Sequence, residues 1–212
     1  MKRVIAKDLL RIKAVYLRLD EPFTWASGIK APIYCDNRLT LSDVEVRDHV
    51  EHALADIIRE PYPECQAIMG TSTAGIPHAA IVSDILRIPM GYVRSSAKDH
   101  GVQHQIEGRC DPGTKVVIME DLVSTAGSVV KVAKSLREAG AEILGIASIF
   151  TYGMKKADER FEEYQLRNVS ASNYETLLDV AVEEGYILKE QIPALMAFRN
   201  DPFDESWLQL IP

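Results

Sequence analysis

The chain has 212 residues, of which 47% are hydrophobic and 26% charged, a balance typical of one globular domain with a substantial core. A membrane span is excluded because no run of about eighteen apolar residues occurs, and the net charge of −7 argues against a general nucleic-acid binder, which normally carries a basic surface. We therefore expect a small-molecule partner, with no nucleic acid and no membrane.

The N-terminal segment and the cysteines bear on where the protein resides. Residues 1–20, MKRVIAKDLLRIKAVYLRLD, carry charges throughout, so they lack the apolar core of a secretory signal and predict an amphipathic helix. Cys35, Cys65 and Cys110 are odd in number and widely spaced, which argues against a disulfide framework or a zinc knuckle. Unpaired cysteines suit a reducing compartment, so we expect a cytoplasmic protein.

A helix is predicted from Ser42, with Ser42 as its N-cap and apolar residues at three- and four-residue spacing from Val46 to Ile58. Beyond this helix, strand and helix patterns alternate along the chain. The predicted strands cover residues 66–70, 89–93, 115–120 and 142–150, and the predicted helices cover residues 76–87 and 128–140. Residues 94–113 form a long polar loop, and the strand over 142–150 is expected to close the series.

Strands that alternate with helices of this length predict an α/β fold with a doubly wound, mainly parallel sheet flanked by helices. Ligands of such sheets bind at the carboxyl ends of the strands. Two stretches rich in small residues, GTSTAG over 70–75 and EDLVSTAGS over 120–128, fall at such ends. Both are therefore candidate ligand-binding loops.

Residues 116–129, VVIMEDLVSTAGSV, set two adjacent carboxylates and a loop of small residues between a strand and a helix. Glu120 and Asp121 would be costly to bury without partners, and the small residues after them leave room for a ligand. Backbone N–H groups at a helix N-terminus suit a phosphate monoester, while the carboxylates suit the two hydroxyls of a ribose. The alternative without a binding role is an acidic strand end followed by a tight turn.

Other nucleotide-binding motifs are not supported. The chain has no G-x-G-x-x-G after a strand and no G-K-[ST], which argues against a dinucleotide fold and a Walker-type site.

Residues 116–129 resemble the phosphoribosyl-diphosphate binding motif of the type I phosphoribosyltransferases, which consists of two or more apolar residues, two acids and a Thr/Ser/Gly loop. Residues 23–42, FTWASGIKAPIYCDNRLTLS, and 92–101, YVRSSAKDHG, look like the hood and the mobile catalytic loop of the orotate phosphoribosyltransferases within that family. With residues 70–80, the resemblance covers most of the chain. It implies the type I phosphoribosyltransferase fold with a small hood.

The same resemblance implies one domain over residues 1–212, with the hood mainly from about 1–42, a C-terminal contribution to it, and a core over about 43–170. It implies that orotate and 5-phosphoribosyl 1-diphosphate react to give orotidine 5′-phosphate and diphosphate, in de novo pyrimidine (UMP) biosynthesis. Mg²⁺ is the implied cofactor, bound mainly through the substrate with no direct protein ligand. The implied assembly is a homodimer whose catalytic loop is shared between subunits.

The residues that the resemblance implies as catalytic are Lys98, His100 and Asp121. Arg94, Lys98 and His100 lie on a loop long enough to close over a ligand, and three donors there can neutralise a diphosphate leaving group. The bland alternative is a solvated charged loop. The other implied contacts to 5-phosphoribosyl 1-diphosphate are Glu120, Asp121, Leu122, Val123, Ser124, Thr125, Ala126, Gly127 and Ser128.

The implied orotate contacts are backbone groups of Tyr34 and Cys35 and the hydroxyl of Ser124. Three positions depart from the pattern of relatives, because alanine or serine stands where many relatives carry lysine. These positions are Ala26, Ala74 and Ser95. The departures leave the reaction class intact but leave open which side chain contacts the base.

Lys30 and Arg38 are the nearby cations that could face a substrate carboxylate. The planar fork of Arg38 could pair bidentately with that carboxylate, but Asp36 or Asp43 in the same chain is an equally good partner.

The remaining histidines and the C-terminal stretch have no assigned role in binding. His49, His52 and His78 fall within helical patterns, where surface or packed histidines are common. Residues 173–207 predict one or two helices that complete the hood or support the sheet, with Trp207 packing instead of binding.

Two other functions compete with this interpretation. Transfer to a purine base would predict a different hood sequence. A nucleic-acid-binding regulator that keeps the phosphoribosyl-diphosphate motif would carry a basic surface or an added winged helix, whereas this chain is acidic.

Overall fold

The computed structural model describes residues 1–25, 28–94 and 105–212. Its centre is a six-stranded sheet with the order β10-β9-β8-β5-β6-β7. Five strands run parallel, and β7 pairs antiparallel with β6 at one edge. The strands are β5 (Ala67–Thr71), β6 (Met90–Val93), β7 (Ile106–Glu107), β8 (Lys115–Val123), β9 (Glu142–Thr151) and β10 (Asn168–Asn173).

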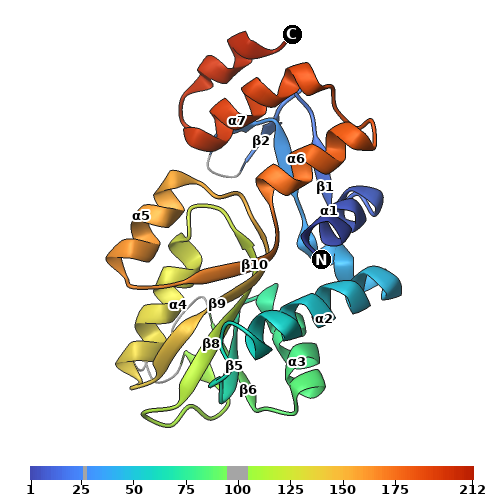
Figure 1. Cartoon of the computed structure of the whole chain (residues 1–212). Coiled ribbons are helices and arrows are strands. Elements are labelled where there is room, and N and C mark those ends of the chain that lie inside the picture. Colours follow the sequence, from blue (N-terminus) through green and yellow to red (C-terminus); the bar gives the residue numbers. More distant parts are fainter. Residues whose placement is uncertain (26–27, 95–104) are drawn as a thin grey trace.

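Helices cover both faces of this sheet, as Figure 1 shows. One face carries α2 (Val44–Arg59) and α3 (Gly75–Leu86), and the other carries α4 (Gly127–Glu138) and α5 (Lys155–Glu163). The central strand β8 serves both layers, because Val117 and Met119 belong to one apolar cluster while Val116 and Ile118 belong to the other. Such alternation is what a strand with two covered faces requires. The predicted doubly wound, mainly parallel sheet is confirmed.

Two short antiparallel ribbons and the C-terminal helices form a cap beyond the carboxyl ends of the strands, which we call the hood (Figure 1). The hood consists of β1 (Val15–Leu17) paired with β4 (Ile33–Cys35), β2 (Phe23–Thr24) paired with β3 (Lys30–Ala31), α6 (Tyr174–Glu183), α7 (Ile192–Asn200), and the 3-10 turns η3 (Lys189–Gln191) and η4 (Glu205–Leu210).

The C-terminal helices are joined to the rest of the hood by aromatic packing. The Trp207 side chain is fully buried and its ring lies 5.9 Å from that of Phe198, which in turn lies 5.7 Å from Trp25. The prediction that Trp207 packs is therefore confirmed. The amphipathic helix predicted over residues 1–20 is confirmed only in part, because α1 (Lys2–Arg11) ends at Arg11 and β1 follows within the same segment. No helix within the described ranges has the length and hydropathy needed to cross a bilayer.

Several predicted boundaries were wrong for identifiable reasons. Ser42 is not the N-cap of α2, because it ends the 3-10 turn η1 (Asn37–Ser42), and the Asp43 carboxylate accepts the capping bond from the Val46 N–H at 3.1 Å. Strand β8 continues to Val123 instead of ending at residue 120, because β9 pairs with it over that whole length.

The predicted end of the strand series at residue 150 was also wrong. Helix α5 and strand β10 follow, and β10 pairs parallel with β9 at the edge of the sheet. Its sequence, NVSASN, has no apolar run that would predict a strand. Polar contacts join it to β9 instead, such as the 2.6 Å hydrogen bond between the Ser148 and Ser170 hydroxyls. Likewise β7 lies inside the loop predicted over 94–113.

The described histidines pack or face solvent, as predicted. Nδ1 of His78 lies 2.6 Å from Oε1 of Glu51 in a fully buried contact between α2 and α3. His49 contacts Asp8, and His52 contacts a carbonyl of its own helix.

Gly75, the first residue of α3, fixes how closely this helix approaches β8. A Cβ atom at Gly75 would lie 2.3 Å from the Met119 carbonyl oxygen and 2.6 Å from Oγ1 of Thr71. Both distances are shorter than any van der Waals contact allows. Only glycine therefore lets the loop after β5 lie against the central strand.

We predict that Gly75→Ala lowers the free energy of unfolding by about 1–3 kcal/mol, the usual cost of overpacking. Helix propensity alone would favour alanine by about 0.5–1 kcal/mol, so a loss measures the steric conflict. Urea unfolding checks this. Gly127→Ala, at the first residue of α4, is the matched control, because the nearest atom there is the movable end of the Arg160 side chain at 3.1 Å. Equal stability of both variants would contradict the prediction.

Candidate active site

Glu120 lies in β8 and is held by protein donors on three sides. Its Oε1 accepts hydrogen bonds from Oγ1 of Thr71 at 2.6 Å and from the Asp121 N–H at 3.1 Å, and its Oε2 accepts one from Oγ of Ser128 at 3.3 Å. The side chain is 5% exposed. Burial, and secondarily the charge of Asp121, raises the pKa of Glu120 to about 8. This carboxyl group therefore joins the end of β5 to the start of α4.

Asp121 is partly exposed and follows Glu120 in the strand, so its side chain points to the opposite face of the sheet. Its backbone carbonyl accepts a 2.7 Å hydrogen bond from Nδ2 of Asn37, a side chain that is 1% exposed. Oδ1 of Asn37 in turn accepts a 3.3 Å hydrogen bond from the Cys35 thiol. Glu120 thus connects β8 to helix α4, and Asp121 connects β8 to Asn37 on the side of the hood.

The loop after β8 presents a helix N-terminus without a side-chain cap. Ala126, in the N-cap position of α4, has a left-handed conformation with φ 60°, and no side chain of the described residues caps the first N–H groups of α4. Arg160 of α5 donates to the Thr125 carbonyl from behind the loop. Free N–H groups and the positive end of the helix dipole make this loop a site for an anion.

A cavity of about 250 Å³ lies between the hood and the end of β8. It brings together all three predicted orotate contacts, and Leu122, predicted to contact the phosphoribosyl moiety, lines it as well. The residues lining it are Thr24, Trp25, Tyr34, Cys35, Leu122, Ser124 and Tyr152. Burial raises the pKa of the Cys35 thiol and of the Tyr152 hydroxyl. Both groups are therefore neutral near pH 7.

No charged side chain lines this cavity in the part of the chain that the structure describes. The two cations named from the sequence have carboxylate partners elsewhere: Lys30 lies 3.0 Å from Glu205, and Arg38 pairs bidentately with Asp36 at 2.6 and 2.8 Å. Of the two partners considered for Arg38, Asp36 is the one found. Ala26 lies outside the described residues.

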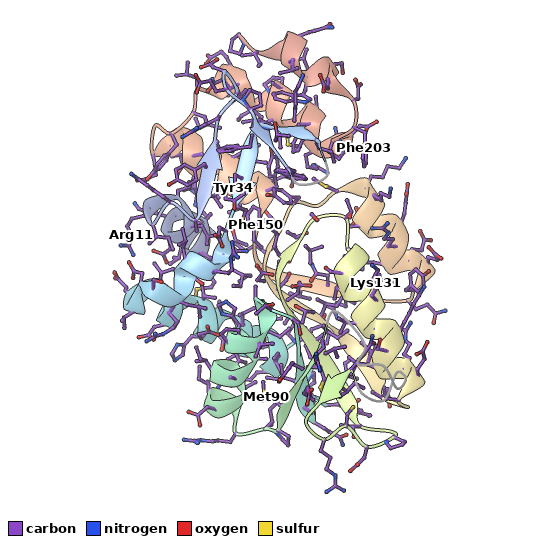
Figure 2. All side chains as sticks on the ribbon, turned by 180° about the vertical axis from the view of Figure 1, so that it is seen from behind. Arg11, Tyr34, Met90, Lys131, Phe150 and Phe203 are labelled. Carbon is purple, nitrogen blue, oxygen red and sulfur yellow. The ribbon has the colours of Figure 1, made fainter. Side chains whose placement is uncertain are left out.

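A second cavity, of about 430 Å³, lies on the α4 side of the sheet beside the end of β5. Thr71 and Ser128, which both bond Glu120, contribute to its lining. The full lining is Thr71, Ser72, Val93, Arg94, Gln105, Ser128, Lys131, Val132, Lys134 and Ser135. The Ser72–Thr73 peptide in the GTSTAG loop is cis. Figure 2 shows Lys131 on α4, well away from Tyr34 of the hood.

The predicted diphosphate contacts are only partly described. Arg94 lines the second cavity and lies 3.6 Å from Glu107 of β7. Lys98 and His100, together with Ser95, lie outside the described residues. No cluster of three or more candidate metal ligands occurs among residues 1–25, 28–94 and 105–212.

Several site residues escaped the sequence analysis. Trp25 and Tyr152 are aromatic residues in apolar segments, which indicate core packing just as well, and their rings lie 5.7 Å apart. Lys131 sits in an ordinary amphipathic helix. Asn37 follows a strand, where asparagine commonly begins a turn. Trp25 and Asn37 had a usable signal, because both lie inside the segment 23–42 that carries the hood resemblance.

Residues 42–184 match the family model described as phosphoribosyl transferase domain. The chain is 50% identical to an orotate phosphoribosyltransferase of Bacillus subtilis over 209 residues, 99% of this chain and 97% of that protein. It is 53% identical to the Bacillus pumilus orotate phosphoribosyltransferase over 209 residues, 99% of each chain.

Solved structures share the fold. The Aeropyrum pernix orotate phosphoribosyltransferase superposes with a TM-score of 0.74 at 29% identity, covering 86% of this chain and 99% of that one. The Leishmania donovani UMP synthase superposes with a TM-score of 0.80 at 27% identity, covering 93% of this chain but 42% of that longer chain.

The raised pKa of Glu120 predicts a specific pH dependence of stability. A carboxyl group whose pKa is raised by folding stabilises the fold fully below its ordinary pKa of 4.5, and this contribution is lost as the pH rises through about 8. Glutamine cannot ionise. The melting temperature of Glu120→Gln minus that of the wild type should therefore increase from pH 5 to pH 8.5 by at least about 2–4 °C, the equivalent of about 1 kcal/mol at this chain length.

Differential scanning calorimetry of the ligand-free proteins measures this difference. The exposed Glu162→Gln is the matched control for loss of a surface carboxylate. A difference that stays constant with pH, or falls, would mean that Glu120 is ionised throughout the range.

Proposed function

The chain belongs to the orotate phosphoribosyltransferases of the phosphoribosyl transferase family, and on this premise we propose that it transfers the 5-phosphoribosyl group of 5-phosphoribosyl 1-diphosphate to orotate. The products are orotidine 5′-phosphate and diphosphate, in de novo pyrimidine (UMP) biosynthesis. One observation carries the proposal: the acid pair lies between two cavities. Leu122 and Ser124 line the cavity under the hood, whereas Thr71 and Ser128, the partners of Glu120, line the other.

The sugar phosphate would occupy the end of β8 and the loop after it. The free N–H groups of α4 and the hydroxyls of Ser124, Thr125 and Ser128 suit the 5-phosphate. Asp121 is the more exposed of the two acids and is free to accept hydrogen bonds from the ribose hydroxyls. Glu120 already accepts three hydrogen bonds from the protein, so its first role is to hold β5, β8 and α4 together at the sugar.

The base would enter the cavity under the hood. Its flat ring could lie against the aromatic wall formed by Trp25 and Tyr152, whose rings contact each other with centroids 5.7 Å apart. The backbone of Tyr34 and Cys35 and the hydroxyl of Ser124 would supply hydrogen bonds, as the family resemblance implies. Position 26 is alanine, where many relatives carry lysine. The neutral Tyr152 hydroxyl would supply a hydrogen-bond donor to the base in place of such a lysine.

The diphosphate would leave through the second cavity. Arg94 and Lys131 both line it, and Lys131 would supply charge that Ala74 does not provide within the GTSTAG loop. Lys98 and His100 would complete the neutralisation of the leaving group. These cations would lower the barrier because they stabilise the negative charge that develops on the diphosphate as it leaves.

Mg²⁺ would supply further charge neutralisation at the diphosphate. The residues fit a metal that takes most of its ligands from the substrate, because the described residues offer an adjacent pair of carboxylates but no three-ligand cluster. The ribosyl centre gains positive charge as the bond to diphosphate breaks, so the hood and the catalytic loop must exclude water from it.

The assembly and the location of the enzyme follow from the resemblance. We expect a cytoplasmic homodimer in which the catalytic loop of one subunit, which carries Lys98 and His100, completes the site of the other. Closed two-fold dimers are the commonest oligomers.

Orotate should be the preferred base, and the reaction should need a divalent metal. Loss of orotate absorbance with 5-phosphoribosyl 1-diphosphate and Mg²⁺ measures the rate, beside parallel assays with uracil, adenine and hypoxanthine. We expect EDTA to abolish activity and excess Mg²⁺ to restore it, because the few cations of the site cannot neutralise a diphosphate alone. Faster use of uracil or a purine, or full activity in EDTA, would refute the proposal.

Loop sharing predicts complementation between two inactive variants. Lys98→Ala lacks a loop cation, and Glu120→Gln with Asp121→Asn lacks both acids. In a heterodimer, the subunit with intact acids would receive an intact loop from its acid-deficient partner, which restores one site of two. Activity should therefore rise to about half of the wild-type value per heterodimer.

Native mass spectrometry establishes the heterodimer fraction in the mixture, and each variant incubated alone is the control. If heterodimers form without recovery of activity, each loop closes on its own subunit.

A further inference from the structure

Asn37 lies where the base cavity meets the acid pair. Resting on the proposed function, we propose that Asn37 is a positioning residue that holds Asp121 in place for the ribose, and that Cys35 orients the Asn37 amide for this task. Neither residue needs to touch the sugar to do so. Through this link, the hood segment that binds orotate would also determine the position of Asp121, which binds the ribose.

The Asn37 side chain bridges two segments that are 84 residues apart in sequence. Its Nδ2 donates to the Asp121 carbonyl at 2.7 Å, and it is 1% exposed, so water cannot easily replace it. The ladder between β8 and β5 ends at the pair Gly70–Met119, two residues before Asp121. Because β5 offers Asp121 no partner, Asn37 supplies a donor to this partly buried carbonyl.

The thiol of Cys35 determines which way the Asn37 amide faces. An asparagine amide can be reversed about its axis, which exchanges its donor and its acceptor. A protonated thiol 3.3 Å from Oδ1 donates to it and leaves Nδ2 facing Asp121. Burial first, and then the charges of Asp121 and Asp36, raise the pKa of this thiol well above its usual value, so it stays a donor at neutral pH.

The 3-10 turn that begins at Asn37 does not depend on this side chain. The Asp36 carboxylate accepts from the Arg38 N–H at 3.2 Å and caps the turn, and the Thr40 hydroxyl donates to the Asn37 carbonyl at 2.7 Å. The backbone of Asn37 is therefore fixed by other groups. Its amide is left to the contact with Asp121, and removal of the amide should leave the turn folded.

The first test compares Asn37→Ala with Asn168→Ala. Asn168 is the matched control, because its amide also accepts one hydrogen bond, from Ser148 at 3.0 Å, and donates one, to Ser170 at 2.9 Å, but at the far edge strand β10. Isothermal titration calorimetry measures the Kd of 5-phosphoribosyl 1-diphosphate with Mg²⁺ and no orotate. Asn37→Ala should raise this Kd about tenfold, because Asp121 is no longer held in position for the ribose, and Asn168→Ala should raise it less than about twofold.

A double-mutant cycle then asks whether Asn37 acts through Asp121. When Asp121→Asn has removed the carboxylate, Asn37→Ala has nothing left to position and should change the remaining affinity, supplied by the phosphate contacts, by less than about twofold. A purely structural role would weaken binding equally in both backgrounds. Additive effects, or equal effects of Asn37→Ala and Asn168→Ala, would overturn the inference.

Cys35 provides a second route that spares Asn37 itself. Cys35→Ser keeps a donor and should bind 5-phosphoribosyl 1-diphosphate within about twofold of the wild type, whereas Cys35→Ala should weaken binding several-fold. In the Asn37→Ala background the two substitutions should be equivalent. If serine and alanine weaken binding equally in the wild-type background, Cys35 does not orient the amide. The proposed function is judged separately, because it fails only if the unmodified enzyme does not convert orotate.

Discussion

The site depends on one buried carboxyl group. Glu120 is 5% exposed and receives hydrogen bonds from Thr71 of the neighbouring strand β5 and from Ser128 of the following helix α4. Removing a carboxyl group from water is costly unless its oxygens are bonded, so these donors must stay in place. Their positions fix where the GTSTAG loop ends and where α4 begins. The glycine at position 75 makes this arrangement possible, because it lets that loop lie directly against β8.

The hood is tied to this centre by polar contacts as well as by apolar packing. The Asn37 amide donates to the Asp121 carbonyl. The Trp25 ring packs against Phe198 and so connects the cavity under the hood to the C-terminal helices. These contacts link the hood to the strand that carries the acid pair. A cavity assembled from both parts can respond to the base and to the sugar together, which suits an enzyme that must bring two substrates into contact and exclude water.

The distribution of charge differs between the two cavities. The cavity under the hood has aromatic and neutral polar walls in the described residues, and the cations near it, Lys30 and Arg38, are paired with protein carboxylates. The other cavity carries Arg94 and Lys131. Cationic charge is thus placed where a diphosphate would depart, and neutral donors where a planar base would bind. This separation favours stabilisation of the leaving group over tight binding of the base.

The sequence by itself determined the sheet, its helices and the phosphoribosyl motif, because strand periodicity and the 116–129 spacing are local properties of the chain. It could not determine that Glu120 is buried and raised in pKa, that Asn37 reaches Asp121, or that Trp25 and Tyr152 share a cavity with Tyr34. Those contacts join segments separated by tens of residues. Edge strand β10 escaped because polar side chains hold it to β9. Only tertiary structure decided these features, since burial and pairing belong to the assembled layers.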